Sequence, residues 1–166
     1  MRLLLLPLVI LLCHAGQGQS ITNNNINGAW SIEEIIWKSK DTTVQIVPKQ
    51  KGIFLITQGH YGMSWSPIRE KRTPFENLSN PTEEEIIKGF QSIVFNSGTY
   101  SIDKNVLTTT AQIAKVPGFE GGKQYYHITH TNNTQVKLTL FDETYPSGKK
   151  PQWLGKWETT FIMEKL

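Results

Sequence analysis

Apolar and polar residues alternate along most of the chain in short runs that turn residues separate. The first run, residues 28–37, is rich in branched and aromatic side chains, which favour strands. The later runs are residues 52–58, 60–68, 98–102, 106–113, 124–131, 135–141 and 156–164. The pattern therefore predicts eight strands, and the tight turns between several of them predict antiparallel neighbours.

One segment departs from the alternating pattern. Thr82 precedes three glutamates at 83–85, an arrangement typical of a capped helix start with acidic groups at the positive end of the helix dipole. Apolar residues then recur at helical spacing at Ile86, Ile87, Phe90, Ile93 and Val94. We predict one short helix between the third and fourth strands, with its apolar stripe against a flank or an open end of the strand assembly.

Eight antiparallel strands with short connections predict an all-β fold, an up-and-down barrel. Closure removes the two exposed edges that an open sheet would present. The interior of such a barrel accommodates packed side chains or one small ligand. A two-layer sandwich is the structural alternative. Nothing in the sequence indicates an internal repeat or a second domain, so residues 28–166 are expected to form one domain.

Three short motifs follow one another along the chain: Gly-Ala-Trp at residues 28–30, a hairpin pattern at residues 52–66 and a Gly-Thr-Tyr strand at residues 98–103. In this order and spacing they resemble the glycine-x-tryptophan signature, the second hairpin and the "G-T-Y" strand of the bacterial and fungal lipocalin-like domain family. The resemblance implies an eight-stranded calycin-type barrel that Trp30 closes at one end and that holds small apolar or amphipathic molecules. The sequence lacks the C-terminal arginine that would stack on Trp30, and Lys165 is expected to take that place as a weaker stacking cation.

The first residues predict export. Arg2, an apolar run at 3–12 and small residues near 15–18 are typical of a signal peptide over residues 1–18. The run is shorter than the roughly 20 residues that span a bilayer. Cys13 lacks a small residue before it, so a lipoprotein anchor is not expected. We expect a periplasmic or extracellular protein whose Asn-rich residues 19–27 form a surface lead-in.

Composition narrows the range of partners. The chain has 17 Lys and Arg against 14 Asp and Glu, a balance too even to indicate nucleic-acid binding. The single cysteine, Cys13, lies in the predicted leader, so the exported domain is expected to have no disulfide and no thiolate metal ligand. Sequons at Asn77 and Asn132 would be relevant only in a eukaryote. A monomer without a transmembrane segment is expected.

Strand parity predicts which side chains face the interior. If Trp30 points inward, Glu34 does too unless a bulge intervenes, and each further strand contributes large apolar side chains to the same face. The predicted ligand-binding residues are Trp30, Glu34, Tyr61, Met63, Trp65, Tyr100 and Trp157. The alternative is that these side chains fill the barrel as a core. Two interpretations remain open for Arg69 and Arg72: they are solvated loop residues, or they contact an acidic group of a ligand at a barrel mouth.

Strong catalytic and metal-binding motifs are absent from the sequence. His127 and His130 are three residues apart in a predicted strand, so they face opposite sides and do not converge on one ion. Ser64 lies within a strand rather than at a nucleophile elbow. We therefore predict no metal, no cofactor and no catalytic residue.

The leading hypothesis is an exported barrel that binds a small hydrophobic or amphipathic molecule. An alternative is a cofactor-free isomerase or cyclase, which needs a titratable group in the cavity, with Glu34 and Tyr100 as candidates. A third possibility is a packed barrel that acts as an interaction module.

Overall fold

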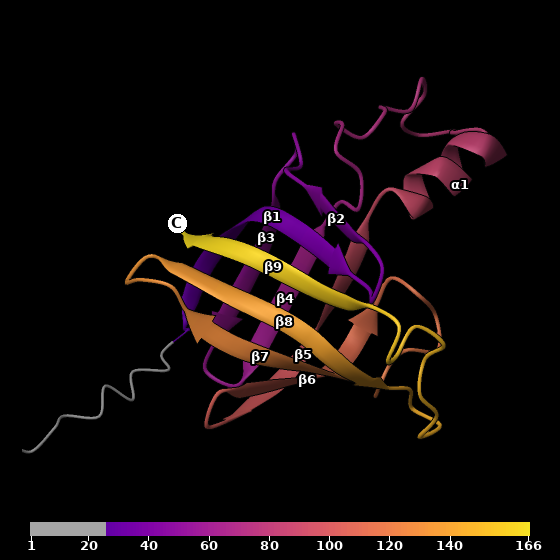
Figure 1. The fold of residues 1–166 in the computed structure, drawn as a ribbon. Coiled ribbons are helices and arrows are strands. Elements are labelled where there is room, and N and C mark those ends of the chain that lie inside the picture. The colour runs from indigo at the N-terminus through magenta and orange to yellow at the C-terminus, as the bar shows by residue number, and fades with distance from the viewer. Residues whose placement is uncertain (1–25) are drawn as a thin grey trace, which may run out of the picture.

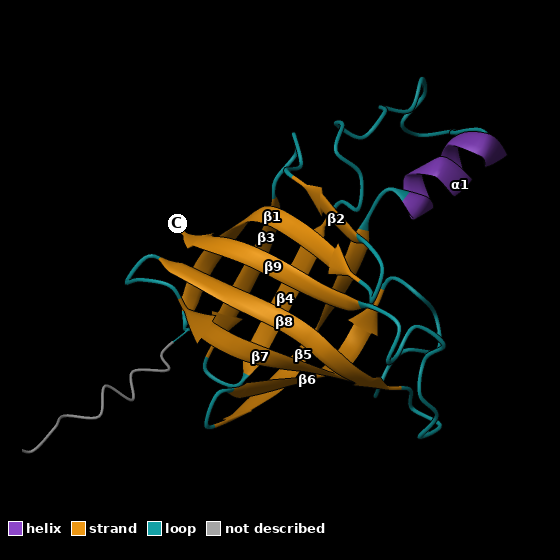
Figure 2. Cartoon of the chain, viewed as in Figure 1, coloured by secondary structure: helices purple, strands orange, loops and turns teal. Residues whose placement is uncertain are grey.

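The computed structural model describes residues 26–166, which form one antiparallel sheet and one helix (Figures 1 and 2). The strands are β1 (Gly28–Lys38), β2 (Thr43–Ile46), β3 (Gly52–Thr57), β4 (His60–Trp65), β5 (Val94–Asp103), β6 (Val106–Ala114), β7 (Lys123–His130), β8 (Gln135–Thr144) and β9 (Glu158–Lys165), and the helix is α1 (Glu83–Gln91). The predicted signal peptide with Cys13, and residues 19–25 of the lead-in, lie outside the described residues.

The sheet closes on itself. Strands β3 to β9 pair in sequence order, β1 pairs with β3, and β1 also pairs with β9, from Trp30 opposite Lys165 to Lys38 opposite Glu158. This eight-stranded antiparallel barrel confirms the predicted fold. Strand β2, which the sequence analysis missed, pairs only with the end of β1. Because β2 enters the count, α1 lies between β4 and β5 rather than between a third and a fourth strand.

The barrel interior is an apolar core built by alternate residues of every barrel strand. Branched and aromatic side chains suit this half-buried pleated surface, which explains why these runs form strands. The most completely enclosed side chains include Phe54 of β3 and Phe161 of β9. The other fully buried side chains are Ile26, Ile32, Ile35, Ile56, Leu107, Val136, Leu138 and Met163.

Three β-bulges interrupt the alternation. The extra residues are Glu33 in β1, Gln112 in β6 and Phe141 in β8, which have no residue opposite them in β9, β5 and β7, respectively. Each extra residue moves the following side chains to the other face of the sheet. Opposite Gln112, a side chain at Gly98 would collide with the backbone carbonyl oxygen of Thr110, so glycine is required at this crossing.

One end of the barrel, called the closed end here, is sealed by Trp30. The short connections 58–59, 104–105 and 131–134 lie at this end. Nε1 of Trp30 donates a hydrogen bond of 2.7 Å to the carbonyl oxygen of Ile26. Nζ of Lys165 lies 5.9 Å from the Trp30 ring centroid, which confirms the predicted stacking cation. Ile26 is 1% exposed, so this part of the lead-in is core rather than surface.

The opposite end, called the open end, carries the long connections 39–51, 66–93, 115–122 and 145–157. Helix α1 belongs to one of them and stands away from the barrel (Figure 1). Its Thr82 capping box and its acidic first turn form as predicted. The expected covering of the barrel by its stripe is wrong, because no residue of α1 is buried and Ile86 and Ile87 are 51% and 57% exposed.

Local interactions explain why α1 forms without a buried face. The cap satisfies backbone N–H groups at the start of the helix, and Glu84 pairs with Lys88 one turn later at 2.6 Å. At the other end, Nε of Arg72 donates to Oγ of Ser92 at 2.9 Å. Ser66 Oγ in turn donates to the Ser92 carbonyl oxygen, which ties the helix terminus to the end of β4. Arg72 is thus a structural residue of this connection.

Candidate functional site

The centre of the barrel is nearly filled. The enclosed space that remains there is about 60 Å³. Trp65 fills much of the section below the open end, with its ring centroid 6.2 Å from that of Trp37 and 5.1 Å from that of Phe161. The residues around the void are Met63, Trp65, Val94, Asn96, Gln124, Tyr126, Leu140, Thr159 and Phe161. A space of this size suits a few water molecules rather than an organic ligand.

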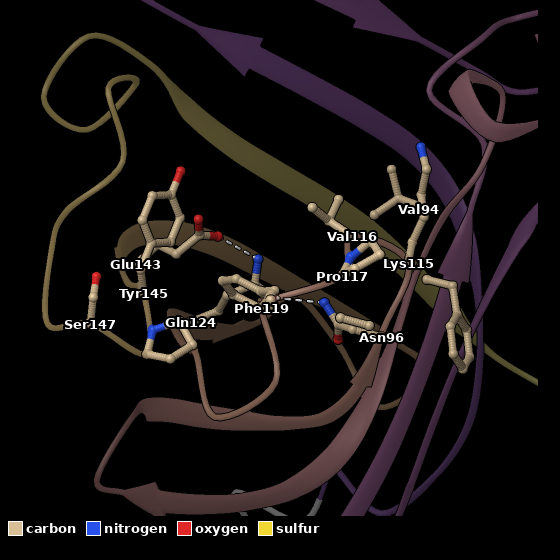
Figure 3. A pocket seen from close by; sticks show the side chains of 14 residues that line it. Val94, Asn96, Lys115, Val116, Pro117, Phe119, Gln124, Glu143, Tyr145 and Ser147 are labelled. Atoms are coloured by element: carbon tan, nitrogen blue, oxygen red, sulfur yellow. Dashed lines mark hydrogen bonds between the residues drawn. The ribbon is translucent and has the colours of Figure 1, made fainter. Parts of the chain in front are cut away.

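A larger cavity, called the mouth pocket here, lies at the open end and has a volume of about 580 Å³ (Figure 3). It lies between the start of β5, the ends of β6 and β8, the start of β7 and the connections that follow β6 and β8. Its walls are largely apolar and include Val94, Phe95, Ala114, Val116, Pro117, Phe119, Tyr145 and Pro146. Both the volume and the lining are typical of small-molecule sites.

Polar side chains from three strands form the inner boundary of the mouth pocket. Nδ2 of Asn96 donates to Oε1 of Gln124 at 3.1 Å, and Nε2 of Gln124 donates to Oε2 of Glu143 at 2.7 Å (Figure 3). The Tyr126 hydroxyl donates to the same Gln124 oxygen at 2.9 Å. Asn96 and Gln124 also border the small central void. The network, called the amide bridge here, therefore separates the pocket from the barrel core.

Glu143 is the buried acidic group of the mouth pocket and is 8% exposed. Burial disfavours its charged form and raises the pKa of its carboxyl above the usual value. Hydrogen bonds from Gln124 and from the Trp153 side chain oppose this rise in pKa, whereas the charge of neighbouring Asp142 adds to it. Asp142 itself is paired with Lys150 at 2.7 Å.

The bulge at Phe141 explains why Glu143 faces inward. Val136, Leu138 and Leu140 alternate inward along β8, and an unbroken alternation would place Asp142 on that face next. Tyr125 is opposite Asp142 and Tyr126 is opposite Leu140, so Phe141 is the extra residue. The alternation therefore shifts, and Glu143 is buried in place of Asp142.

Two buried oxygen atoms near the amide bridge lack a hydrogen-bond partner. They are Oδ1 of Asn96 and the hydroxyl oxygen of Tyr61. The Tyr61 side chain faces Thr109 without a well-formed bond, and burial raises its pKa to about 12. Buried polar groups are usually paired, so these two oxygen atoms are exceptions within the barrel.

Lys115 is the basic residue of the mouth pocket. Its Nζ lies 4.2 Å from the ring centroid of Phe90, the last large apolar residue of α1. In Figure 3 the Lys115 side chain extends away from Glu143 and Gln124. Partial burial lowers its pKa. The ammonium group is therefore directed toward the helix and not toward the amide bridge.

The residues predicted to bind a ligand are spread along the barrel. Trp30 seals the closed end, and Tyr61 is packed in the core. Tyr100 packs against the core and donates to Oδ1 of Asn27 at 2.9 Å, toward the closed end. Met63 and Trp65 border the small void. Of the predicted residues, Met63 and Trp65 therefore lie on the inner side of the amide bridge, around the same void as Asn96 and Gln124.

Two predicted residues lie outside the barrel interior. The bulge at Glu33 places Ile35 in the core, so neighbouring Glu34 faces the other side of the sheet. Its predicted inward orientation is corrected by that bulge. Trp157 is 37% exposed and lies at the rim beside Phe141, in a shallow depression away from the mouth pocket.

The sequence analysis missed Asn96, Gln124 and Glu143. Gln124 was within its reach, because it lies in the predicted strand 124–131, whereas Asn96 precedes the predicted strand 98–102 although β5 begins at Val94. Glu143 lies beyond residue 141, where the predicted strand ended, so strand parity did not assign it a face.

Residues 26–166 contain no group of three or more potential metal ligands, and His127 stacks on Phe141 with ring centroids 4.0 Å apart. Over the same residues, no helix has the length and apolar character of a membrane span.

Several solved structures are similar to this chain at low sequence identity. A lipocalin-like protein from Bacteroides uniformis is 12% identical with a TM-score of 0.41, and the match covers 84% of this chain and 97% of that one. An uncharacterized protein from Bacteroides eggerthii is 11% identical with a TM-score of 0.41, covering 84% and 98%. A redesigned β-barrel is 13% identical with a TM-score of 0.36, covering 85% and 91%. No curated protein matches the chain.

The family comparison is more specific. The model of the lipocalin-like domain matches residues 27–162, which includes every barrel strand in whole or in part. A barrel of this kind is in general a ligand-binding fold. The match and the closed eight-stranded barrel together show that the chain belongs to the lipocalin-like domain family.

Proposed function

We propose that this protein is an exported carrier that binds a small amphipathic molecule in the mouth pocket. The observation that supports this proposal is the combination of a cavity of about 580 Å³ with largely apolar walls and a polar inner boundary. The apolar part of a ligand would lie against Val116, Pro117 and Phe119, and its polar end would face the amide bridge. Export rests on the sequence of residues 1–18 alone.

The position of the free space supports the mouth of the barrel rather than its centre as the binding site. The central void, about 60 Å³, is far below the roughly 300–1,000 Å³ of known ligand sites, whereas the mouth pocket is within that range. Tyr61, Met63 and Trp65 then act as the packed base beneath the ligand. Their direct contact with a ligand stays a prediction.

Binding is favoured over the isomerase or cyclase alternative by where its candidate residues lie. Glu34 faces away from the core, and the Tyr100 hydroxyl is engaged with Asn27 toward the closed end. Neither residue lines the mouth pocket. A titratable group that does line the pocket, Glu143, is hydrogen-bonded within the amide bridge, and a binding site needs only the apolar walls and the polar boundary that are present.

The test uses two neighbouring residues of β6 as a matched pair. Ala114 lines the mouth pocket, whereas Ile113 is 61% exposed on the outer surface. Titration with N-phenyl-1-naphthylamine, a neutral fluorescent probe, should give saturable binding to the unmodified protein. Ala114→Phe fills the pocket and should weaken binding by about tenfold or more, equivalent to at least about 1.4 kcal/mol.

Ile113→Phe adds the same ring outside the pocket and should leave probe binding unchanged. Equal loss in both variants, or saturable binding that Ala114→Phe does not weaken, contradicts the mouth pocket as the site. Absence of any saturable binding contradicts the proposal for this class of ligand. Circular dichroism of both variants controls for the fold.

A further inference from the structure

We infer that the ligand of the mouth pocket carries an ammonium group, which pairs with Glu143. This inference rests on the proposed function and adds the chemical class of the ligand, an amine with an apolar body. It depends on the charges at the inner boundary of the pocket and on the direction of the hydrogen bonds in the amide bridge.

The first step is the charge balance of Glu143. Its carboxylate is nine-tenths buried, and none of the ion pairs among residues 26–166 includes it. The groups that hydrogen-bond it, from Gln124 and Trp153, are neutral. A buried carboxylate is strongly destabilised unless an opposite charge accompanies it. The protein supplies hydrogen bonds to this group but no cation.

The second step concerns Lys115, the other charged residue of the pocket lining. Its ammonium group lies over Phe90 of α1 and is directed away from the amide bridge. An anionic head group at the inner boundary would meet Glu143 rather than this cation. A cationic head group would pair with Glu143 and would leave Lys115 in place at the rim.

The third step is the direction of the hydrogen bonds. An ionised carboxylate only accepts, so Gln124 must present Nε2 to Glu143 and Oε1 to Asn96 and Tyr126. Asn96 must then present Nδ2 to Gln124, which leaves its Oδ1 without a partner. The acceptors that face the pocket are therefore the oxygens of Glu143, and a head group with several N–H donors matches them.

Glu143 contributes more to this recognition than Asn96 does. Oδ1 of Asn96 is enclosed by protein, so a ligand can bond to it only after the amide turns. Glu143 lines the pocket directly. A charge-assisted hydrogen bond is roughly twice as strong as a neutral one, so an ammonium should be preferred over a hydroxyl on the same apolar body.

The experiment compares three ligands that differ only in the head group: octylamine, 1-octanol and octanoic acid. Isothermal titration calorimetry at about pH 7, below the aggregation limit of each compound, measures the affinities for the full chain. We expect octylamine to bind about tenfold more tightly than 1-octanol. Octanoic acid should bind most weakly.

Glu143→Gln should lower the affinity for octylamine to about that of 1-octanol and should leave the 1-octanol affinity nearly unchanged. Glu164→Gln, which neutralises an exposed carboxylate in β9, is the control and should change neither value. The comparison of head groups on the unmodified protein is decisive even if Glu143→Gln fails to fold.

Octanoic acid binding as tightly as octylamine, or octylamine retaining its advantage in Glu143→Gln, would overturn the inference. Tighter binding of the acid would place the head group near Lys115 and would also overturn it. In each of these outcomes an octyl compound still binds, and the proposed function stands. Lack of binding by all three compounds contradicts the proposed function itself.

Discussion

The two ends of the barrel are built from the same strands but differ in almost every other respect. At the closed end, short turns join the strands, and Trp30 lies over the core with Lys165 beside its ring. At the open end the strands are joined by four long connections, two of which, 115–122 and 145–157, help to line a pocket whose inner boundary is a hydrogen-bonded network. An apolar ring seals one end, and a polar hydrogen-bonded network lines the pocket at the other. Changes at the closed end should therefore alter stability, and changes at the open end should alter binding.

The largest effect should come from removing the ring that seals the closed end. Trp30→Ala deletes a side chain that is 3% exposed and should lower the free energy of unfolding by about 3–5 kcal/mol. Trp157→Ala is the matched control at the open end. Because that ring is 37% exposed, its loss should cost about 1 kcal/mol or less. Urea unfolding followed by circular dichroism measures both, and equal losses would contradict the contrast between the ends.

The next effect concerns pH and the open end. The folded protein raises the pKa of Glu143, so between the ordinary value of 4.5 and the raised value the folded state holds a proton that the unfolded state has lost. The contribution of this group to stability is therefore fully present below about pH 4.5 and is lost as pH rises through the folded pKa. Glu143→Gln mimics the protonated form and should remove this loss.

The measurement is the difference in unfolding free energy between the unmodified protein and Glu143→Gln, taken from urea midpoints at several pH values. The variant should gain relative stability as pH increases above about 4.5. Glu164→Gln, at an exposed carboxylate of the closed end, is measured in parallel as the control variant. A relative loss of stability in Glu143→Gln at higher pH would mean that the folded state favours the ionised form.

The smallest effect should come from the cation at the closed end. Lys165→Met keeps most of the aliphatic side chain and removes the charge over Trp30, so it should lower stability by about 0.5–1 kcal/mol. Lys165→Arg should preserve stability or increase it, because guanidinium stacks well on aromatic rings. Probe binding at the mouth pocket should be unaffected in both variants. A change in probe affinity would show that the two ends are coupled.

The fold followed from the sequence because it depends on patterns that repeat. The alternation in the strands, the capping signal at Thr82 and the Gly-Ala-Trp motif at 28–30 each reflect local chemistry that is visible in short segments. Strand β2 was missed because four residues, three of them exposed, give too short a pattern. Helix α1 formed as predicted, but its packing depends on the connection that holds it away from the barrel.

The site was less predictable because it depends on bulges. The extra residues Glu33 and Phe141 each reverse the alternation, and they exchange the roles of two carboxylates. The first turns Glu34, the predicted interior acid, outward, and the second turns Glu143 inward. A bulge depends on the register against the neighbouring strand, which no single stretch of sequence contains. The amide bridge needs three strands in register and is subject to the same limit.

The pairing of β1 with β9 also has a consequence for how the chain folds. The first strand of the barrel can complete its ladder only against the last, so the contact that closes the barrel joins residues that are at least 120 positions apart in the sequence. Contacts between distant segments slow folding, and barrels rich in them typically fold in milliseconds to seconds. Until β9 is available, the edge of β1 that faces it has no partner strand, although the other edge can already pair with β2 and β3.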